Sequence, residues 1–247
     1  IFLLRKALKK AGFEFVPVIS LSFGMEKNSG FSLTLPLIRR FVGGLVYGDQ
    51  LMLLSNQTKP YEVNKGESMA LVADWSDKIS KMLIEGNGYT LEEIDENLDK
   101  ITKSFSEIKL NKVPKVKVGI VGEIYVKYSS FGNNGLEKFL LSQGCEYMVP
   151  GVLGFFQYCF ANNETDYLYY GGKRSNVFIG KKIEKLGDKW DNDLIEALKP
   201  YPEFVAPVSF ERVKQLADTV IDRGVKMGEG WLLPGEVCEL IEKGYTN

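Results

Sequence analysis

The residues from 116 to 150 constrain the fold more than any other part of the sequence. A nearly continuous run of apolar and β-branched residues, VKVGIVGEIYV, is typical of a central parallel strand that is covered on both faces. The run leads through the polar stretch YSSFGNN to a helical pattern, GLEKFLLSQG, and then to a second strand, CEYMVP. Because parallel strands need a crossover connection, this order predicts one βαβ unit.

The whole chain is predicted to be an α/β protein with two lobes. A basic link that contains proline, KLNKVPKVK, separates a mostly helical first lobe, residues 1–111, from a second lobe, residues 112–247. The second lobe begins with the strand at residues 116–122. We expect it to be a Rossmann- or flavodoxin-like parallel sheet flanked by helices, and we expect that sheet to be incomplete in the present sequence.

The first lobe is predicted to hold one strand and several helices. An amphipathic helix ends at Gly12, and a buried strand, FEFVPVISLSF, and a loop, GMEKNSG, follow it. A mostly buried helix is expected from Leu33, a second helix over residues 68–85, and a third that begins with a capping box formed by Thr90 and Glu93. One strand is too few for a complete α/β domain, so we expect this chain to be part of a longer protein.

Charge and hydropathy exclude two classes of partner. The 247 residues carry a net charge of −1, so no overall basic field would attract nucleic acid or an anionic membrane. No apolar run approaches the roughly 18 residues that a membrane-spanning helix requires. We therefore expect no nucleic-acid partner, no membrane partner and a cytoplasmic location.

The histidine and cysteine content narrows the chemistry further. The sequence has no histidine, which excludes Ser-His-Asp triads, Cys-His pairs and HExxH zinc sites from this chain. Its three cysteines, Cys145, Cys159 and Cys238, are far apart and lack the short spacing of zinc or redox motifs. They could hold an iron–sulfur cluster or be unrelated residues of the core, and we expect no metal site and no cofactor in this chain.

The candidate site lies at the carboxyl end of the first strand of the βαβ unit, where open α/β sheets bind ligands. Glu123 ends the strand, and there it either contacts a ligand or holds the loop by accepting backbone N–H bonds. Asn133 and Asn134 precede the next helix, whose free N–H groups could bind a phosphate, or the two residues simply cap that helix. Gly119 and Gly122 lie within the strand, so a dinucleotide fingerprint is not favoured.

A second stretch, GEGWLLPGE, carries Glu229 and Glu236 on either side of Trp231. These glutamates are candidate site residues or simply part of the entry into a helix. We expect Glu229 or Trp231 to form another wall of the pocket that Glu123 and the asparagines face. The tyrosines at 167, 169 and 170, beside GGKR, are expected to form a semi-exposed packing surface rather than a nucleic-acid patch.

Three stretches resemble the 2-hydroxyacyl-CoA dehydratase superfamily, in particular the carboxyl-terminal region of large activase-related proteins, the CoA-substrate-specific enzyme activases. They are VKVGIVGEIYVKYSSFGNNGLEKFLLSQGCEYMVP, the late segment MGEGWLLPGEVCELIEKGYTN, and ALKKAGFEFVPVISLSFGMEKNSGF with the following GLVYGDQLM and KPYEVNKG. The resemblance implies a longer parent in anaerobic metabolism, in which ATP hydrolysis drives an electron through [4Fe–4S] clusters to a dehydratase. It assigns no cluster ligand, nucleotide site or catalytic residue to this chain.

Three hypotheses about function follow. The chain is a dehydratase-like domain of an activase-related protein, without a complete active site of its own. Alternatively, it is a docking module without a cofactor that binds a 2-hydroxyacyl-CoA dehydratase, or it is an independent nucleotide- or flavin-binding α/β enzyme. In the first two cases its partners are the remainder of its own longer chain and the dehydratase, and the [4Fe–4S] cluster and ATP belong to the intact protein.

Overall fold

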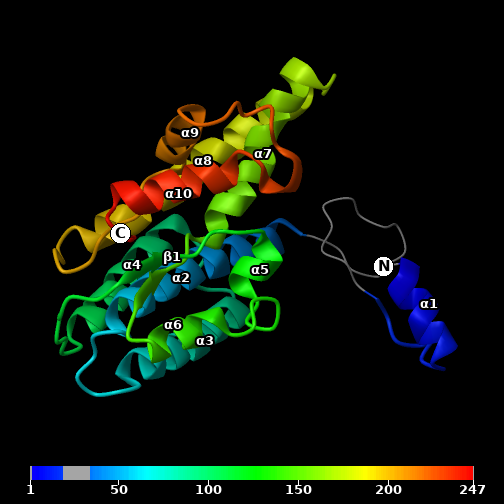
Figure 1. The fold of residues 1–247 in the computed structure, drawn as a ribbon. Coiled ribbons are helices and arrows are strands. Elements are labelled where there is room, and N and C mark those ends of the chain that lie inside the picture. The colour runs from blue at the N-terminus through cyan, green and yellow to red at the C-terminus, as the bar shows by residue number, and fades with distance from the viewer. Residues whose placement is uncertain (1, 19–33, 247) are drawn as a thin grey trace. The chain divides into compact units, whose positions relative to one another are not determined.

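A computed structural model describes residues 2–18 and 34–246 of the chain, which is mostly helical there, with two short strands (Figure 1). The chain divides into two compact units, residues 1–39 and 40–247. Among the described residues, no helix is both long enough and apolar enough to cross a membrane.

The first unit contains helix α1, Phe2–Lys10. Its predicted end is confirmed, because Gly12 adopts a φ of 80° and the N–H of Phe13 bonds the carbonyl of Leu8. The strand predicted to follow is not formed over residues 13–18, which are turns and coil. Phe15 is 80% exposed there, so the burial that would favour a strand is missing. The rest of that predicted strand and the loop after it lie outside the described residues.

The helices expected between residues 33 and 109 are confirmed: α2 is Leu35–Thr58, α3 is Glu67–Glu85 and α4 is Leu91–Ser106. The second half of α2 is buried, as its apolar pattern predicts. Thr90 and Glu93 form the predicted capping box at the start of α4. Gly86, with a φ of 88°, ends α3.

The βαβ unit is present as predicted, with shorter strands: β1 is Lys117–Gly119, α5 is Ile124–Tyr128, α6 is Leu136–Ser142 and β2 is Glu146–Met148. The two strands pair in parallel, with Lys117 opposite Glu146. The predicted strand does not continue through residue 126, because Glu123 caps a helix that begins at Ile124. The α/β class is therefore correct, and a two-stranded parallel sheet is what the described residues contain.

The remaining chain is helical: α7 is Val152–Tyr169, α8 is Arg174–Leu198, α9 is Phe210–Asp218, η1 is Met227–Glu229 and α10 is Leu232–Glu242. These helices gather in the upper part of the second unit in Figure 1, while α3 and α6 occupy its lower part. Of these, α8 runs without a break over 25 residues.

The main hydrophobic core of the second unit combines residues from both sides of the predicted boundary at residue 111. Leu54 of α2 and Phe105 of α4 belong to the same buried cluster as Met148 of β2 and Leu194 of α8. The larger unit accordingly runs from residue 40 to 247, without a division at the basic link. The physical reason is that α2 and α4 have apolar faces that β2, α8 and α10 cover.

Candidate functional site

A cavity of about 80 Å³ lies where the chain leaves β2 and enters α7. Residues 148–151, at the carboxyl end of β2, form one part of its wall, and helices α2, α7, α8, α9 and α10 contribute most of the remainder. The ionisable and amide side chains that line it are Asp49, Gln157, Asp191, Glu236 and Glu239. Four carboxyl groups thus line one space, at the edge of the sheet where α/β proteins bind ligands.

Asp49 of α2 caps the start of α7. Its Oδ1 accepts the N–H of Val152 and its Oδ2 that of Leu153, both at 2.8 Å. A Cβ on Gly151 would lie 2.7 Å from Oδ2, so the close approach requires glycine at that position. Asp49 is 7% exposed, and the loss of water raises the pKa of its carboxyl to about 6, although the two N–H bonds oppose that shift.

Asp191 of α8 and Glu239 of α10 bond backbone N–H groups in the same way. Asp191 Oδ2 accepts the N–H of Phe210 at 2.8 Å, at the first residue of α9, and Glu239 Oε1 accepts the N–H of Val208 at 3.0 Å. Removal from water raises the pKa of Asp191 to about 6 and that of Glu239 to about 7. Gln157 completes this group by donating from Nε2 to Asp191 Oδ2 at 3.1 Å.

Of the four carboxyl groups, Glu236 is the one that forms an ion pair with another described residue. Its Oε1 lies 2.6 Å from the Nζ of Lys127, and both side chains are almost fully buried. Burial still raises the pKa of Glu236, although the attraction of Lys127 opposes it. The other oxygen, Oε2, has no hydrogen-bond partner, and neither has Oε1 of Gln157.

This arrangement suits proton exchange near neutral pH. Carboxyl groups with pKa values of about 6 to 7 hold or release a proton close to neutrality, which ordinary aspartates and glutamates do not. The space admits several water molecules or a small ion. It is far below the volume that a nucleotide or an acyl-CoA requires.

The predicted site residues after β1 lie at the starts of α5 and α6. Glu123 is exposed and accepts the N–H of Tyr125 at 3.0 Å, which makes it the cap of α5. Asn133 accepts N–H groups from Gly135 and Leu136 at the start of α6, and Asn134 is exposed with a φ of 55°. Glu123 and Asn133 thus bond backbone N–H groups at helix starts, and neither they nor Asn134 line the cavity.

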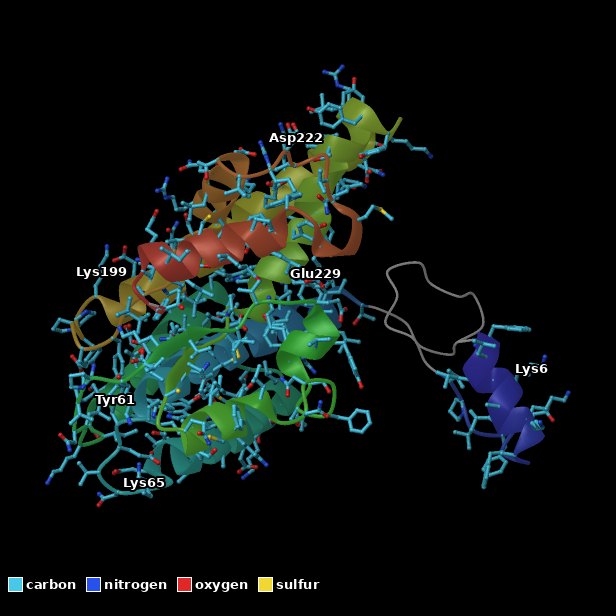
Figure 2. All side chains as sticks on the ribbon, in the orientation of Figure 1. Lys6, Tyr61, Lys65, Lys199, Asp222 and Glu229 are labelled. Atoms are coloured by element: carbon cyan, nitrogen blue, oxygen red, sulfur yellow. The ribbon has the colours of Figure 1, made fainter. Side chains whose placement is uncertain are left out.

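Glu229 and Trp231 are buried. Glu229 Oε1 accepts the N–H of Ile124 at 3.0 Å, so it brings the turn before α10 to the start of α5, directly after Glu123 (Figure 2). Its Oε2 has no partner. Trp231 is 1% exposed, packs among aromatic residues, and donates from Nε1 to Asn162 at 2.9 Å. Glu229 and Glu123 are therefore neighbours, whereas Trp231 belongs to a hydrophobic core.

The cysteines do not fit an iron–sulfur cluster in this structure. Cys145 begins the approach to β2, Cys159 is on α7 and Cys238 is on α10, and all three are free thiols. Within the described ranges, no group of three or more His, Cys, Asp or Glu side chains is arranged to hold a metal ion. The residues present therefore offer no set of ligands for a cluster.

Sequence reasoning missed Asp49, Asp191, Glu239 and Lys127. Asp49 did leave a signal, since it is the one charged residue in GGLVYGDQLMLL, a stretch predicted to be buried. Asp191 and Glu239 left none, because an acidic residue on an amphipathic helix normally faces solvent. Glu236 was predicted as a candidate site residue or as part of the entry into a helix, and it does line the cavity.

Comparison of the chain with family models, curated proteins and solved structures gives no significant match.

Proposed function

We propose that this chain is a dehydratase-like domain of an activase-related protein that works in a 2-hydroxyacyl-CoA dehydratase system. The observation that carries the proposal is the carboxyl-lined cavity at the end of β2. Part of its wall comes from stretches in which the sequence resembles that superfamily, and Gln157 and Asp191 lie outside them. GLVYGDQLM supplies Asp49, CEYMVP supplies the strand end, and the late segment supplies Glu236 and Glu239.

The role proposed for the cavity is proton transfer. Removing water from a 2-hydroxyacyl-CoA requires a proton for the departing hydroxyl group. A carboxyl group with a pKa of about 7, such as Glu239, can hold one at neutral pH and release it to water in the cavity, which would relay it to the substrate outside. The cavity is too small for the substrate itself. In this proposal, ATP hydrolysis and the [4Fe–4S] clusters belong to the remainder of the longer protein and to the dehydratase.

The finer fold proposed with this function is a Rossmann- or flavodoxin-like parallel sheet of which β1 and β2 are a part. The residues after α10 support it, since the hydroxyl of Thr246 lies 3.5 Å from the carbonyl of Lys117, at the start of β1. Lys117 Nζ also donates to the carbonyl of Gly244 at 2.9 Å. A strand beside β1 at this place would give the order 2-1-3 of flavodoxin-like sheets.

An anaerobic assay of the intact system tests the proposal. We expect Glu239→Gln, which keeps an acceptor for Val208 but cannot release a proton, to lower the rate of 2-hydroxyacyl-CoA dehydration by roughly 10²–10⁴-fold. Glu242→Gln, on the same helix but at an exposed ion pair with Arg212, is the matched control and should keep the wild-type rate. A wild-type rate for Glu239→Gln in a folded protein contradicts the proposal.

The second candidate function is a docking module, and one surface favours it. The end of α7 exposes Leu168, Tyr169 and Tyr170, each more than 60% exposed, and Phe178 at the start of α8 is 64% exposed. Contiguous exposed aromatic residues are typical of protein interfaces. Asp222, labelled in Figure 2, lies beside Tyr169 and Tyr170 and marks the place of this surface in the second unit.

Co-purification with the dehydratase distinguishes this candidate from the first. If α7 docks, Leu168→Ser and Tyr169→Ser should abolish the complex and leave the fold intact. Phe139→Ser removes a 58%-exposed aromatic residue on α6 and is the matched control. An unchanged complex in the α7 variants would exclude docking through this surface.

A further inference from the structure

The wall of the cavity at the end of β2 offers hydrogen-bond acceptors without free side-chain donors. Gln157 and Tyr245 are the lining residues with donor groups in their side chains, and both groups are used. Gln157 Nε2 bonds Asp191, and the Tyr245 hydroxyl bonds the carbonyl of Val205. The occupant of such a space has to donate hydrogen bonds or carry positive charge.

Two acceptors on the wall are left without a partner. Oε2 of Glu236 and Oε1 of Gln157 make no hydrogen bond, and these residues are 2% and 3% exposed. A buried polar atom without a partner costs about 1–3 kcal/mol, so native proteins normally satisfy it with a ligand or a bound water. Both atoms belong to residues that line the cavity together with Asp49, Asp191 and Glu239.

The charge of the wall is not balanced by the protein. Lys127 pairs with Glu236 and also acts on Asp49, whereas the hydrogen bonds to Asp49, Asp191 and Glu239 come from N–H groups. The other charged groups that act on these four carboxyls are Asp188 and Glu229, which add negative charge, and Lys243 near Glu239. Ionisation of these three carboxyl groups is therefore costly near neutral pH, and a cation beside them would offset that cost.

Size and geometry restrict the cation. A space of about 80 Å³ admits an ion of the size of ammonium or potassium, or a methylammonium group. A divalent metal is disfavoured, because the described carboxyl groups do not converge in threes on one point. We propose that this cavity binds one compact monovalent cation, ammonium, a short protonated amine or potassium, between α2, α8 and α10. The inference does not depend on the function proposed above.

Titration calorimetry and thermal unfolding of the protein at pH 7.5 test this site. Ammonium, methylammonium and potassium chloride are compared with tetramethylammonium chloride at equal ionic strength. We expect a saturable heat and a saturable rise in Tm with one or more of the small cations, and neither with tetramethylammonium. The separate titrations identify which of the three binds. Equal responses to all four salts, or a stronger response to magnesium or calcium, would overturn the proposal.

Variants and a change of pH test whether the cation binds in this cavity. Asp191→Asn and Glu239→Gln should weaken it at least tenfold, whereas Glu242→Gln, exposed on the same helix, should leave it unchanged. Lowering the pH to 5 should weaken binding to the wild type, because protons then compete with the cation for the carboxyl groups. This second measurement stands even if a variant fails to fold. An unchanged affinity at pH 5, or in both folded variants, would refute a site in this cavity.

Discussion

The chain leaves both strands through a capped helix, but the caps differ in kind. After β1, Glu123 and Asn133 bond N–H groups two or three residues further along, and Glu123 stays exposed. After β2, the start of α7 is capped by Asp49, which precedes it by 103 residues and is buried. A local cap stabilises one helix at little cost. A distant buried cap joins two elements and removes a carboxyl group from water.

The same pattern recurs around the cavity, where Asp191 and Glu239 also bond the N–H groups of distant segments. Each of these carboxyl groups is buried at a position where an apolar side chain of similar size would make the fold more stable. The β2 end therefore concentrates polar groups with altered acidity, while the β1 end does not. Such concentration is typical of functional sites, which is the reason for placing the candidate site at β2.

Among the changes that test this difference between the two strand ends, the largest loss of stability is expected at the buried pair of Lys127 and Glu236. Lys127→Met leaves Glu236 buried without a cation and should lower the free energy of unfolding by roughly 3–5 kcal/mol. Urea denaturation measures this. The double variant with Glu236→Leu should recover most of the loss, and Lys78→Met, at an exposed pair with Asp74, should cost less than about 1 kcal/mol. A similar loss at both lysines would show that burial does not distinguish them.

The next effect is the dependence of stability on pH. The pKa values of Asp49 and Asp191, about 6, and of Glu239, about 7, lie above the usual 3.8 and 4.5, so the folded state binds more protons between these limits. The stabilising contribution of these groups is complete below pH 4 and is lost as the pH rises through 6 to 7. We expect the free energy of unfolding to fall by roughly 2–4 kcal/mol between pH 5.5 and pH 8.

Denaturation curves across this range measure how the free energy of unfolding depends on pH, and variants identify the residues that cause the dependence. Glu239→Gln should flatten the slope, because the glutamine does not titrate. Glu123→Gln, at the exposed cap after β1, should leave it unchanged. A stability that rises across this range would contradict the raised pKa values of the buried carboxyl groups.

The smallest effect is expected at the local caps themselves. Glu123→Ala and Asn133→Ala each remove one capping side chain and should cost about 0.5–1 kcal/mol, with no change in the cation response of the cavity. Thermal unfolding resolves a difference of this size. A loss of several kcal/mol at either position would mean that the β1 end carries more than local capping.

Local sequence patterns predicted most of the helices because their causes are local. The capping box of Thr90 and Glu93, the glycine that ends α3 and the apolar face of α4 depend on residues three or four apart. The βαβ unit was predictable for the same reason. The predicted first strand is longer than β1, because Glu123 caps a helix that begins at Ile124 in spite of the β-branched pattern.

The sequence by itself determined the α/β class, the order of most elements and the absence of imidazole chemistry, since each depends on composition or on near neighbours. Only the tertiary structure decided that residues on both sides of the basic link share one core. Only the tertiary structure gathered Asp49, Asp191 and Glu239 around one cavity. The physical reason is that burial sets the acidity of a carboxyl group, and burial depends on contacts between residues more than a hundred positions apart.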